Sequence, residues 1–330
     1  MAPAPVDRPA EPRPLGERPA LQRLGLQRLG LQRLGALGSL VPNPVRDLAR
    51  PLARRVGLAA PPGEWWQLGV APWAPPRRAE RRAGAWCNVC RWQGDGFESG
   101  FHSEFAHCPR CGSIARDRFL RWCFLTRTPS PGGATVIETS PRMGDHYRTM
   151  MKRWFDYRTS DFDLGAHTGD VQLDLQDIDL PDASLDVVLT AHVLEHVPDT
   201  GRALAELFRV IRPGGRMYLQ VPLVYGVTSV PVEPEFHADN TPVFFNFGWD
   251  LTDRLRAAGF TTTVLVTEEY ERVLRSGTTD HDANVDGFHL DQLVEHVRLD
   301  DLTAVATPEE ARLVGFLPGH HFATWECLRP

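Results

Sequence analysis

Downstream of residue 128, short β-branched apolar runs alternate with longer segments whose apolar residues recur every three or four positions. The clearest unit begins with the run Asp186–Thr190, which predicts a buried parallel strand. A polar turn follows, and then a predicted helix that Asp199 or Thr200 would cap. The apolar face of this helix is expected to consist of Leu204, Leu207, Phe208 and Ile211. Residues 212–215 end the helix and residues 217–221 form the next strand, so the alternation predicts an α/β fold with a parallel sheet.

Similar apolar runs predict further strands on both sides of this unit. They cover residues 134–138, 157–161, 171–174, 260–266 and 321–328. Ser140 as N-cap and Pro141 at the first helical position predict a helix that runs to about Trp154. Another helix is expected over residues 249–258, and residues 268–318 are interpreted as an insertion rich in acids and histidines.

Four of the six cysteines form two Cys-x-x-Cys pairs that are seventeen residues apart. The pairs are Cys87 with Cys90 and Cys108 with Cys111. This spacing predicts a tetrahedral Cys₄ zinc site in a small zinc ribbon, and a complete set of four ligands makes the zinc structural. Four reduced thiols or a redox pair are the alternatives, and His102 and His107 are the nearby alternative ligands.

Residues 113–124, directly after the second cysteine pair, have the apolar spacing of a helix. Ser113 is expected to cap it. The residues expected to face inward are Ile114, Phe119, Leu120, Cys123 and Phe124. Arg116, Asp117 and Arg121 are expected to face outward.

Two runs of sequence carry a resemblance to a known family. The run D-V-V-L-T-A-H-V-L-E-H-V over residues 186–197, followed by R-P-G-G, resembles class I S-adenosylmethionine (SAM) dependent methyltransferases of the methyltransferase type 11 group. The run C-P-R-C-G-S-I-A-R-D-R over residues 108–118 resembles members that carry an N-terminal zinc ribbon. The resemblance covers residues 86–330 and implies a Rossmann-like sheet with helices on both faces. It places the last strand antiparallel at the edge of the sheet.

The resemblance implies that SAM binds at the carboxyl ends of the strands. The residues expected to hold it are Glu138, Ser140, Asp161, Asp174, Leu175, Ala191 and His192. Asp161 would accept hydrogen bonds from the ribose hydroxyls, Asp174 would accept one from the adenine amine, and Leu175 would pack on the ring. The glycine-rich loop of the family is missing after Glu138. We expect the N–H groups of the helix that Ser140 caps to face the methionine carboxylate instead.

The turn after Thr190 contains His192, Glu195 and His196. His196, and after it His237 in the connection over residues 222–246, are the predicted general bases, because imidazole titrates near neutral pH. His192 is the alternative base in the turn itself. Alternatively, His192, Glu195 and His196 hold a divalent metal. A third interpretation gives Glu195 and His196 no chemical role beyond ordering the turn.

Net charge is −6, but it is unevenly distributed over the 330 residues. Residues 1–85 contain 14 arginines and 6 acidic residues, which gives +8 and leaves −14 for the remainder. This first segment also contains half of the 28 prolines and three LQRLG repeats, so it is interpreted as a disordered tail, with a basic membrane- or partner-binding segment as the alternative. The sequence shows neither a membrane-spanning run nor a signal peptide, which predicts a cytoplasmic protein.

These patterns divide the chain into a tail over residues 1–85, a zinc ribbon with its linking helix over 86–127, and a SAM-dependent methyltransferase domain over 128–330. The expected reaction moves a methyl group to a small-molecule or glycan-type acceptor by in-line displacement. An acidic catalytic region argues against nucleic acid as a partner. An rRNA methyltransferase that uses the ribbon for RNA, and a non-catalytic binding module without the glycine loop, are the two alternative hypotheses.

Overall fold

The computed structural model describes residues 84–98, 106–129, 132–165, 169–222, 226–237, 240–277, 295–316 and 323–330. All of them belong to one compact unit that spans Leu52–Pro330. The predicted tail, with its LQRLG repeats, lies outside the described residues except for Gly84 and Ala85, and His102 lies outside them as well. Among the described residues, no helix is both long enough and apolar enough to cross a membrane.

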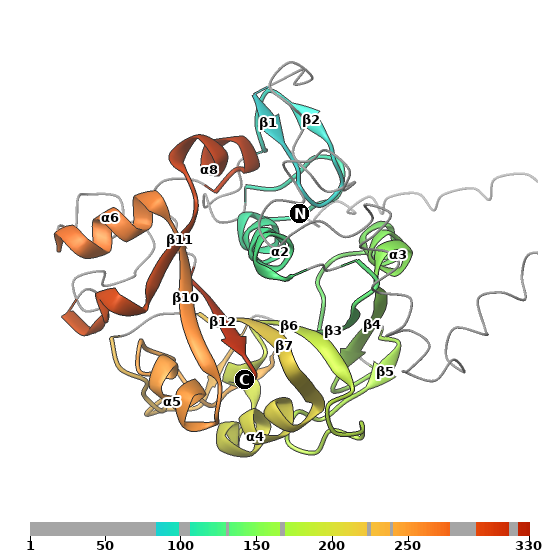
Figure 1. Ribbon diagram of the computed structural model, residues 1–330, viewed down its shortest axis with the longest axis vertical. Coiled ribbons are helices and arrows are strands. Elements are labelled where there is room, and N and C mark those ends of the chain that lie inside the picture. Colours follow the sequence, from blue (N-terminus) through green and yellow to red (C-terminus); the bar gives the residue numbers. More distant parts are fainter. Residues whose placement is uncertain are drawn as a thin grey trace, which may run out of the picture. The chain divides into compact units, whose positions relative to one another are not determined.

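A mixed eight-stranded sheet is the centre of this unit (Figure 1), with the strand order β11-β10-β12-β7-β6-β3-β4-β5. The strands are β3 (Thr135–Thr139), β4 (Asp156–Asp161), β5 (Val171–Gln172), β6 (Leu185–Ala191), β7 (Ile211–Gln220), β10 (Thr261–Thr267), β11 (Leu302–Ala306) and β12 (Thr324–Leu328). All neighbours pair in parallel except β12, which is antiparallel to both β7 and β10.

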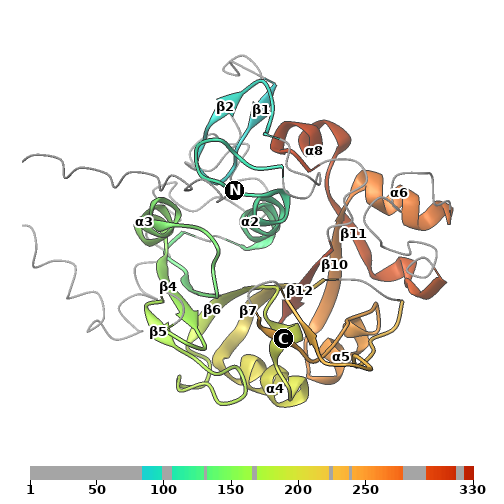
Figure 2. The same cartoon turned by 180° about the vertical axis from the view of Figure 1, so that it is seen from behind.

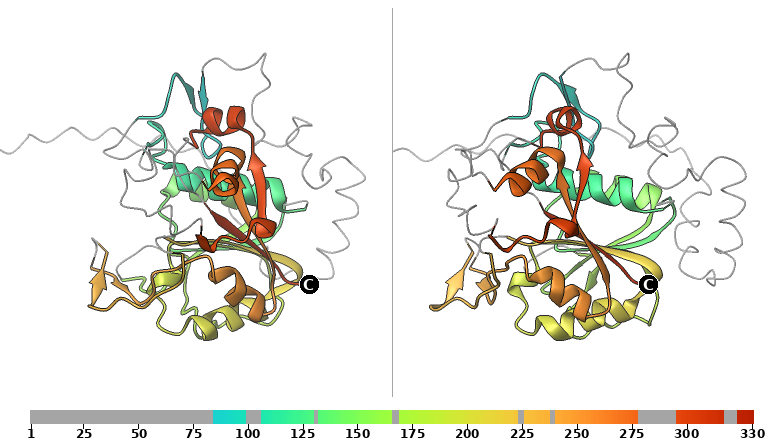
Figure 3. Two further views of the ribbon diagram at one scale, coloured as in Figure 1. Left: turned by 90° about the vertical axis from the view of Figure 1, so that its left-hand side faces the viewer. Right: turned by 60° about the vertical axis from the view of Figure 1, so that its left-hand side comes forward.

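Helices cover both faces of the sheet, as the view in Figure 1 and the turned views in Figures 2 and 3 show. One face carries α4 (Thr200–Val210) and α5 (Leu251–Ala257). The other carries α2 (Ala115–Arg127) and α3 (Asp145–Trp154). Two further helices, α6 (Glu268–Ser276) and α8 (Pro308–Val314), contact β11. The described residues also form two short 3₁₀ helices, η3 (Leu194–His196) and η5 (Leu299–Asp301).

Consecutive strand residues alternate between two hydrophobic cores, one on each face of the sheet. In β6, Val188 belongs to the core beneath α4, whereas Val187 and Leu189 belong to the core beneath α2 and α3. Helices cover both faces of the sheet, so a strand needs apolar residues on both of its faces, which is why these strands read as continuous apolar runs. The predicted Rossmann-like α/β fold with helices on both faces is confirmed.

The last strand is antiparallel, as expected, but its predicted place at the edge of the sheet is wrong. β12 lies inside the sheet, between β7 and β10. The edge strand on this side of the sheet is β11, which belongs to the segment interpreted as an insertion. The sequence Leu302–Ala306 is short and has only two buried residues, so its pattern was too weak to indicate a strand.

Three predicted helix ends also need correction. α3 begins at Asp145 with Gly144 as N-cap, so Ser140 caps no helix. α2 begins after Ile114, whose N–H donates to Asp117 Oδ2 at 3.0 Å, and Ser113 is not its cap. Ile211 is not on the face of α4 but begins β7, although it is buried in the same core.

The ribbon is part of the same folded unit as the sheet. Its hairpin of β1 (Ala85–Trp86) and β2 (Gln93–Gly94) is antiparallel, and Trp86 and Val89 are buried in the core beneath α2. Arg121, which was expected to face solvent, is buried and donates from Nε to the carbonyl of Asn88 at 3.0 Å. The carboxylate of Asp117 also turns inward, with 14% of its side chain exposed.

A second hairpin, β8 (Glu235–Phe236) and β9 (Pro242–Val243), lies in the long connection after β7. It packs on η3, because the Phe244 N–H donates to the carbonyl of Glu195 at 2.8 Å. This contact brings the hairpin over the turn that follows β6.

Candidate active site

A pocket opens at the carboxyl ends of β3 and β6. These two strands are neighbours, and the chain leaves them in opposite directions: β4 and β5 extend the sheet on the side of β3, and β7 extends it on the side of β6 (Figure 1). Ligands of open α/β sheets bind at such a reversal of strand order. Glu138, Ser140 and Ala191 line this pocket, as do residues of α2 and the ribbon residue Val89.

Glu138, one residue before the end of β3, is buried. Its Oε2 accepts hydrogen bonds from Tyr147 Oη at 2.8 Å and from Tyr157 Oη at 2.7 Å. Burial raises the pKa of Glu138 to about 7, against the effect of both tyrosine hydroxyls. The carboxyl group therefore changes its charge within the physiological range, and two neutral donors fix its position.

Asp161 lies at the end of β4, next to the end of β3. Its Oδ2 accepts a hydrogen bond from Ser140 Oγ at 2.7 Å, and its Oδ1 accepts one from the Asp163 N–H at 3.1 Å. Ser140 has a φ of +42°, in the left-handed region, so the chain turns sharply just where the glycine loop was expected. The hydroxyl of Ser140 thus stabilises the loop through Asp161 and does not cap a helix.

Asp174 follows β5, and its Oδ1 accepts a hydrogen bond from the Gln176 N–H at 2.8 Å. Leu175 is buried in the core beneath α4. Their roles at the adenine stay predictions.

His192, in the turn after β6, is held by a residue of α2. Arg116 Nη1 lies 3.0 Å from His192 Nδ1. A guanidinium group can only donate, so the imidazole accepts here. Burial lowers the pKa of His192 well below its usual value, and the charge of Arg116 lowers it further. His192 is therefore a neutral acceptor and a poor candidate for the general base.

Glu195, His196 and His237 form a cluster beside His192: their possible ligand atoms all lie within 4.8 Å of one another, and His192 Nδ1 lies 3.8 Å from Glu195 Oε1. Glu195 comes from η3, and 1% of its side chain is exposed. Burial raises its pKa to about 8. The rings of His196 and His237 meet edge to face with centroids 4.7 Å apart. The hairpin thus supplies a second imidazole to the turn after β6.

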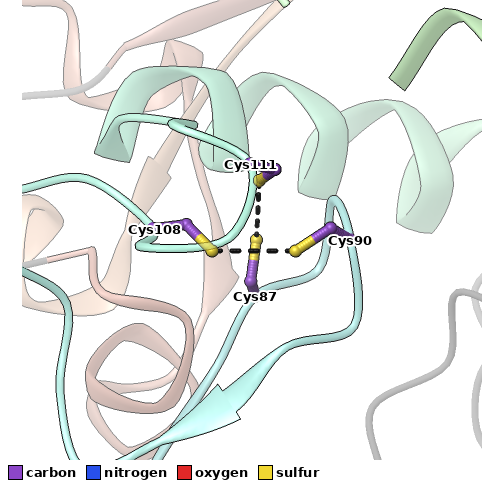
Figure 4. Close-up of side chains that lie close together, drawn as sticks. All are labelled: Cys87, Cys90, Cys108 and Cys111. Atoms are coloured by element: carbon purple, nitrogen blue, oxygen red, sulfur yellow. Dashed lines mark hydrogen bonds between the residues drawn. The ribbon is translucent and has the colours of Figure 1, made fainter. Parts of the chain in front are cut away.

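Figure 4 shows the four cysteines of the two pairs gathered around one point. Cys87 Sγ lies 3.7 Å from Cys111 Sγ, and Cys90 Sγ lies 3.6 Å from Cys108 Sγ. Four sulfurs bound to one zinc at about 2.3 Å lie about 3.8 Å apart in a regular tetrahedron, so the arrangement fits the ion. Ser113 Oγ is 3.4 Å from Cys87 Sγ. His107 lies apart from this set, with Nε2 2.9 Å from Glu98 Oε2.

Comparison with known proteins adds a second kind of evidence. Residues 134–219 match the methyltransferase domain family. This segment runs from β3 into β7 and contains every predicted cofactor residue.

Relatives and solved structures are similar to this chain over limited segments. A probable S-adenosylmethionine-dependent methyltransferase of Mycolicibacterium smegmatis is 36% identical over 89 residues, which are 26% of this chain and 32% of that protein. Trans-aconitate 2-methyltransferase of an Azoarcus species is 29% identical over 115 residues, which are 32% of this chain and 46% of that protein. A SAM-dependent methyltransferase structure from Mesorhizobium loti has a TM-score of 0.39 and 16% identity, covering 66% of this chain and 99% of the other. The chain thus spans less than half the length of these two curated relatives.

The structure brings together residues that the sequence could only place on separate elements. Glu138, Ser140 and Ala191 share one pocket with Arg116, which was expected to face solvent. The spacing of α2 gave no sign of this, because Arg116 lies on the helix face that an isolated helix would turn to water. His196 and His237, which were both predicted as bases, lie in contact.

Proposed function

We propose that the chain is a SAM-dependent methyltransferase that acts on a small, hydroxyl-bearing acceptor. The observation that carries the proposal is the pocket at the reversal of strand order, inside the segment that matches the methyltransferase domain family. In this proposal, Asp161 accepts hydrogen bonds from the ribose hydroxyls and Asp174 accepts one from the adenine amine. Leu175 and Ala191 supply apolar contact to the cofactor.

The methionine end of the cofactor needs a partner, because no glycine-rich loop follows β3. α3 begins with Asp145, an acid that disfavours a second carboxylate at this helix end. Arg116 and Arg142 both line the pocket. Guanidinium groups bind carboxylates through two parallel hydrogen bonds. We therefore assign the methionine carboxylate to these two arginines and not to the helix that Ser140 was expected to cap.

Methyl transfer from a sulfonium needs alignment of nucleophile, methyl carbon and sulfur, and a dry site. A hydroxyl acceptor must also lose its proton. His196 and His237 lie at the turn after β6, at the same end of the sheet as the pocket, and are the side chains we propose for activating the acceptor. His192 is assigned to holding the cofactor side of the site together with Arg116.

The hairpin region suggests an acceptor with an apolar body. Five large apolar side chains of this connection are exposed: Val227, Val230, Val232, Phe236 and Phe244. Apolar surface of this kind next to polar catalytic groups is typical of small-molecule sites. A nucleic acid or glycan acceptor would be served better by basic or polar surface, so an rRNA substrate is the alternative to exclude.

The Cys₄ cluster is proposed to hold a structural zinc. A bound tetrathiolate carries excess negative charge, and Arg118 is a fully buried cation next to it. Burial lowers the pKa of Arg118, and the charges of Cys87 and Cys108 oppose this effect. Arg118 also donates to the carbonyls of Val314 and Ala106, which joins the ribbon to α8. Zinc would therefore stabilise the wall of the cofactor pocket.

Calorimetric titration of the zinc-loaded protein with SAM and S-adenosylhomocysteine tests the proposal. Loss of one hydrogen bond to a charged group costs about 1.5–3 kcal/mol, so Asp161→Ala and Asp174→Ala should each bind about 10- to 100-fold more weakly. Asp156→Ala is the matched control, because Asp156 lies at the opposite end of the same strand as Asp161. A folded wild type that binds neither ligand, or an equal loss in Asp156→Ala, would refute the assignment.

A further inference from the structure

The proposed function does not explain what stabilises the buried carboxyl group of Glu195. Both of its carboxylate oxygens are buried and accept no hydrogen bond from any described residue. Leaving a buried charged group without a partner costs more than about 1–3 kcal/mol. Protonation removes the charge but leaves the new O–H and the remaining oxygen equally without partners. Buried orphan groups in native proteins call for an explanation, and a bound ion is one of the few available.

The neighbouring imidazole is oriented as a metal ligand is. His196 Nδ1 lies 2.6 Å from the carbonyl oxygen of Pro242, which can only accept. Nδ1 therefore carries the proton, and in the neutral ring the lone pair is on Nε2. That nitrogen lies 3.8 Å from Glu195 Oε1. A backbone carbonyl that fixes the tautomer in this way is the usual second partner of a metal-bound histidine.

His237 completes the set from the hairpin, and His192 does not belong to it. His192 accepts a hydrogen bond from Arg116 at 3.0 Å, which occupies the lone pair of its Nδ1. His237 and His196 supply nitrogen atoms that lie with a Glu195 oxygen within 4.8 Å of one another. A cation with bonds of about 2.1 Å needs donors about 3.0–3.4 Å apart, so the three groups must close by about 1 Å. His237 lies next to a two-stranded hairpin, which can supply this movement more readily than the sheet can.

We propose that Glu195, His196 and His237 bind a divalent first-row transition metal ion through two imidazoles and one carboxylate. This donor set is that of the facial triads and of catalytic zinc sites, which keep positions open for a further ligand. The inference rests on the proposed function for what fills those positions: a hydroxyl or hydroxyl-and-carboxylate group of the acceptor. The exposed rings of Phe236, which precedes His237 in the sequence, and of Phe244, which follows β9, would contact the apolar body of that acceptor.

The ion would make the acceptor oxygen nucleophilic by lowering the pKa of its hydroxyl. The proton leaves to water, the oxygen forms a bond to the methyl carbon, and the carbon–sulfur bond breaks. Its electron pair stays on sulfur, so the sulfonium becomes a thioether. No oxidant or reductant takes part.

The test uses Mn²⁺, which has the lowest affinity of the series for nitrogen and sulfur ligands and therefore leaves zinc in the thiolate site. The full-length protein is first brought to one zinc per chain, and loosely bound metal is removed. Mn²⁺ binding is then measured by the loss of the free-ion electron paramagnetic resonance signal. We expect one Mn²⁺ per chain, with binding weakened at least about tenfold in Glu195→Gln and His237→Asn.

Two control variants test whether the loss of Mn²⁺ binding is specific to the proposed ligands. His192→Asn separates the proposed set from one that includes His192, and Glu233→Gln removes an exposed acid from the same connection. Both should bind Mn²⁺ as the wild type does. No Mn²⁺ binding by the wild type, undiminished binding by Glu195→Gln, or loss in His192→Asn would each overturn the inference. SAM titration of the same samples keeps the two proposals apart, because Mn²⁺ binding without SAM binding would refute only the proposed function.

Discussion

Replacing Glu138 by glutamine should change how the stability of the protein depends on pH. The carboxyl group is buried, and two tyrosine hydroxyls donate to it. Burial raises its pKa from 4.5 to about 7. Each pKa unit corresponds to about 1.4 kcal/mol, so the full difference corresponds to about 3 kcal/mol.

The direction in which stability changes with pH follows from which state of the protein binds the proton more tightly. Between pH 4.5 and pH 7 the folded protein keeps a proton on Glu138 that the unfolded chain has already lost. The contribution of this group to stability is therefore complete below pH 4.5 and is lost as the pH rises to about 7. Glutamine has nearly the same shape, still accepts from the tyrosines and does not titrate. The free energy of unfolding of Glu138→Gln, relative to wild type, should rise by about 2–3 kcal/mol between pH 5 and pH 7.5.

Urea unfolding at both pH values, followed by circular dichroism, measures this difference. Glu206→Gln is the control, because the hydrogen bond from Arg209 lowers the pKa of Glu206, so this group stays ionised in the folded protein at both pH values and the relative stability of Glu206→Gln should hardly change. The same relative stability of Glu138→Gln at pH 5 and pH 7.5 would refute the reasoning, because Glu138 would then not hold its proton more tightly in the folded state.

Three further outcomes follow from the structure. Cys108→Ser should remove the bound zinc and lower Tm by about 10 °C or more, because the free energy of zinc binding stabilises the fold; metal content and a thermal melt check this, and an unchanged Tm after complete zinc loss would contradict it. Gly248→Ala should weaken Mn²⁺ binding and cost about 1–3 kcal/mol of stability, since a Cβ there would lie 2.5 Å from the backbone of Val227 and displace the connection that holds His237; Gly96→Ala, which meets nothing within 4 Å, should change neither quantity. Raising the salt concentration from 50 to 200 mM should change methyl transfer to the true acceptor less than about tenfold, whereas an RNA acceptor would lose several hundredfold or more.

The sequence predicted most of the parallel sheet, because buried parallel strands read as apolar runs whatever their neighbours are. The sequence also indicated which four cysteines the structure brings together, because the spacing within each pair is local. The order of the strands could not be predicted in this way. Nothing in the sequence Thr324–Leu328 indicates that this strand pairs with β7 on one side and with β10 on the other. That placement depends on contacts between residues far apart in the chain.

The candidate site, too, could be predicted only in part from the sequence, because its contacts join residues far apart in the chain. Each candidate histidine could be found by its residue type and its turn, but their partners could not. Arg116 meets His192 across 76 positions of sequence, and His196 meets His237 only because a hairpin folds back on η3. The prediction of a helix N-terminus at Ser140 failed for a local reason, since its side chain bonds to Asp161 and the chain takes a left-handed turn there.

The position of β12 has a consequence for how the protein is made. β12 comes after all other strands of the sheet in the sequence, so each of them leaves the ribosome before it. Until then β10 and β11 can pair with each other but have no partner that joins them to β7. The nascent protein therefore exposes two unpaired strand edges in the middle of its future sheet, and such edges invite pairing with other chains. A premature stop codon just before Thr324 would leave the sheet permanently in two pieces, where the loss of a true edge strand would only narrow it.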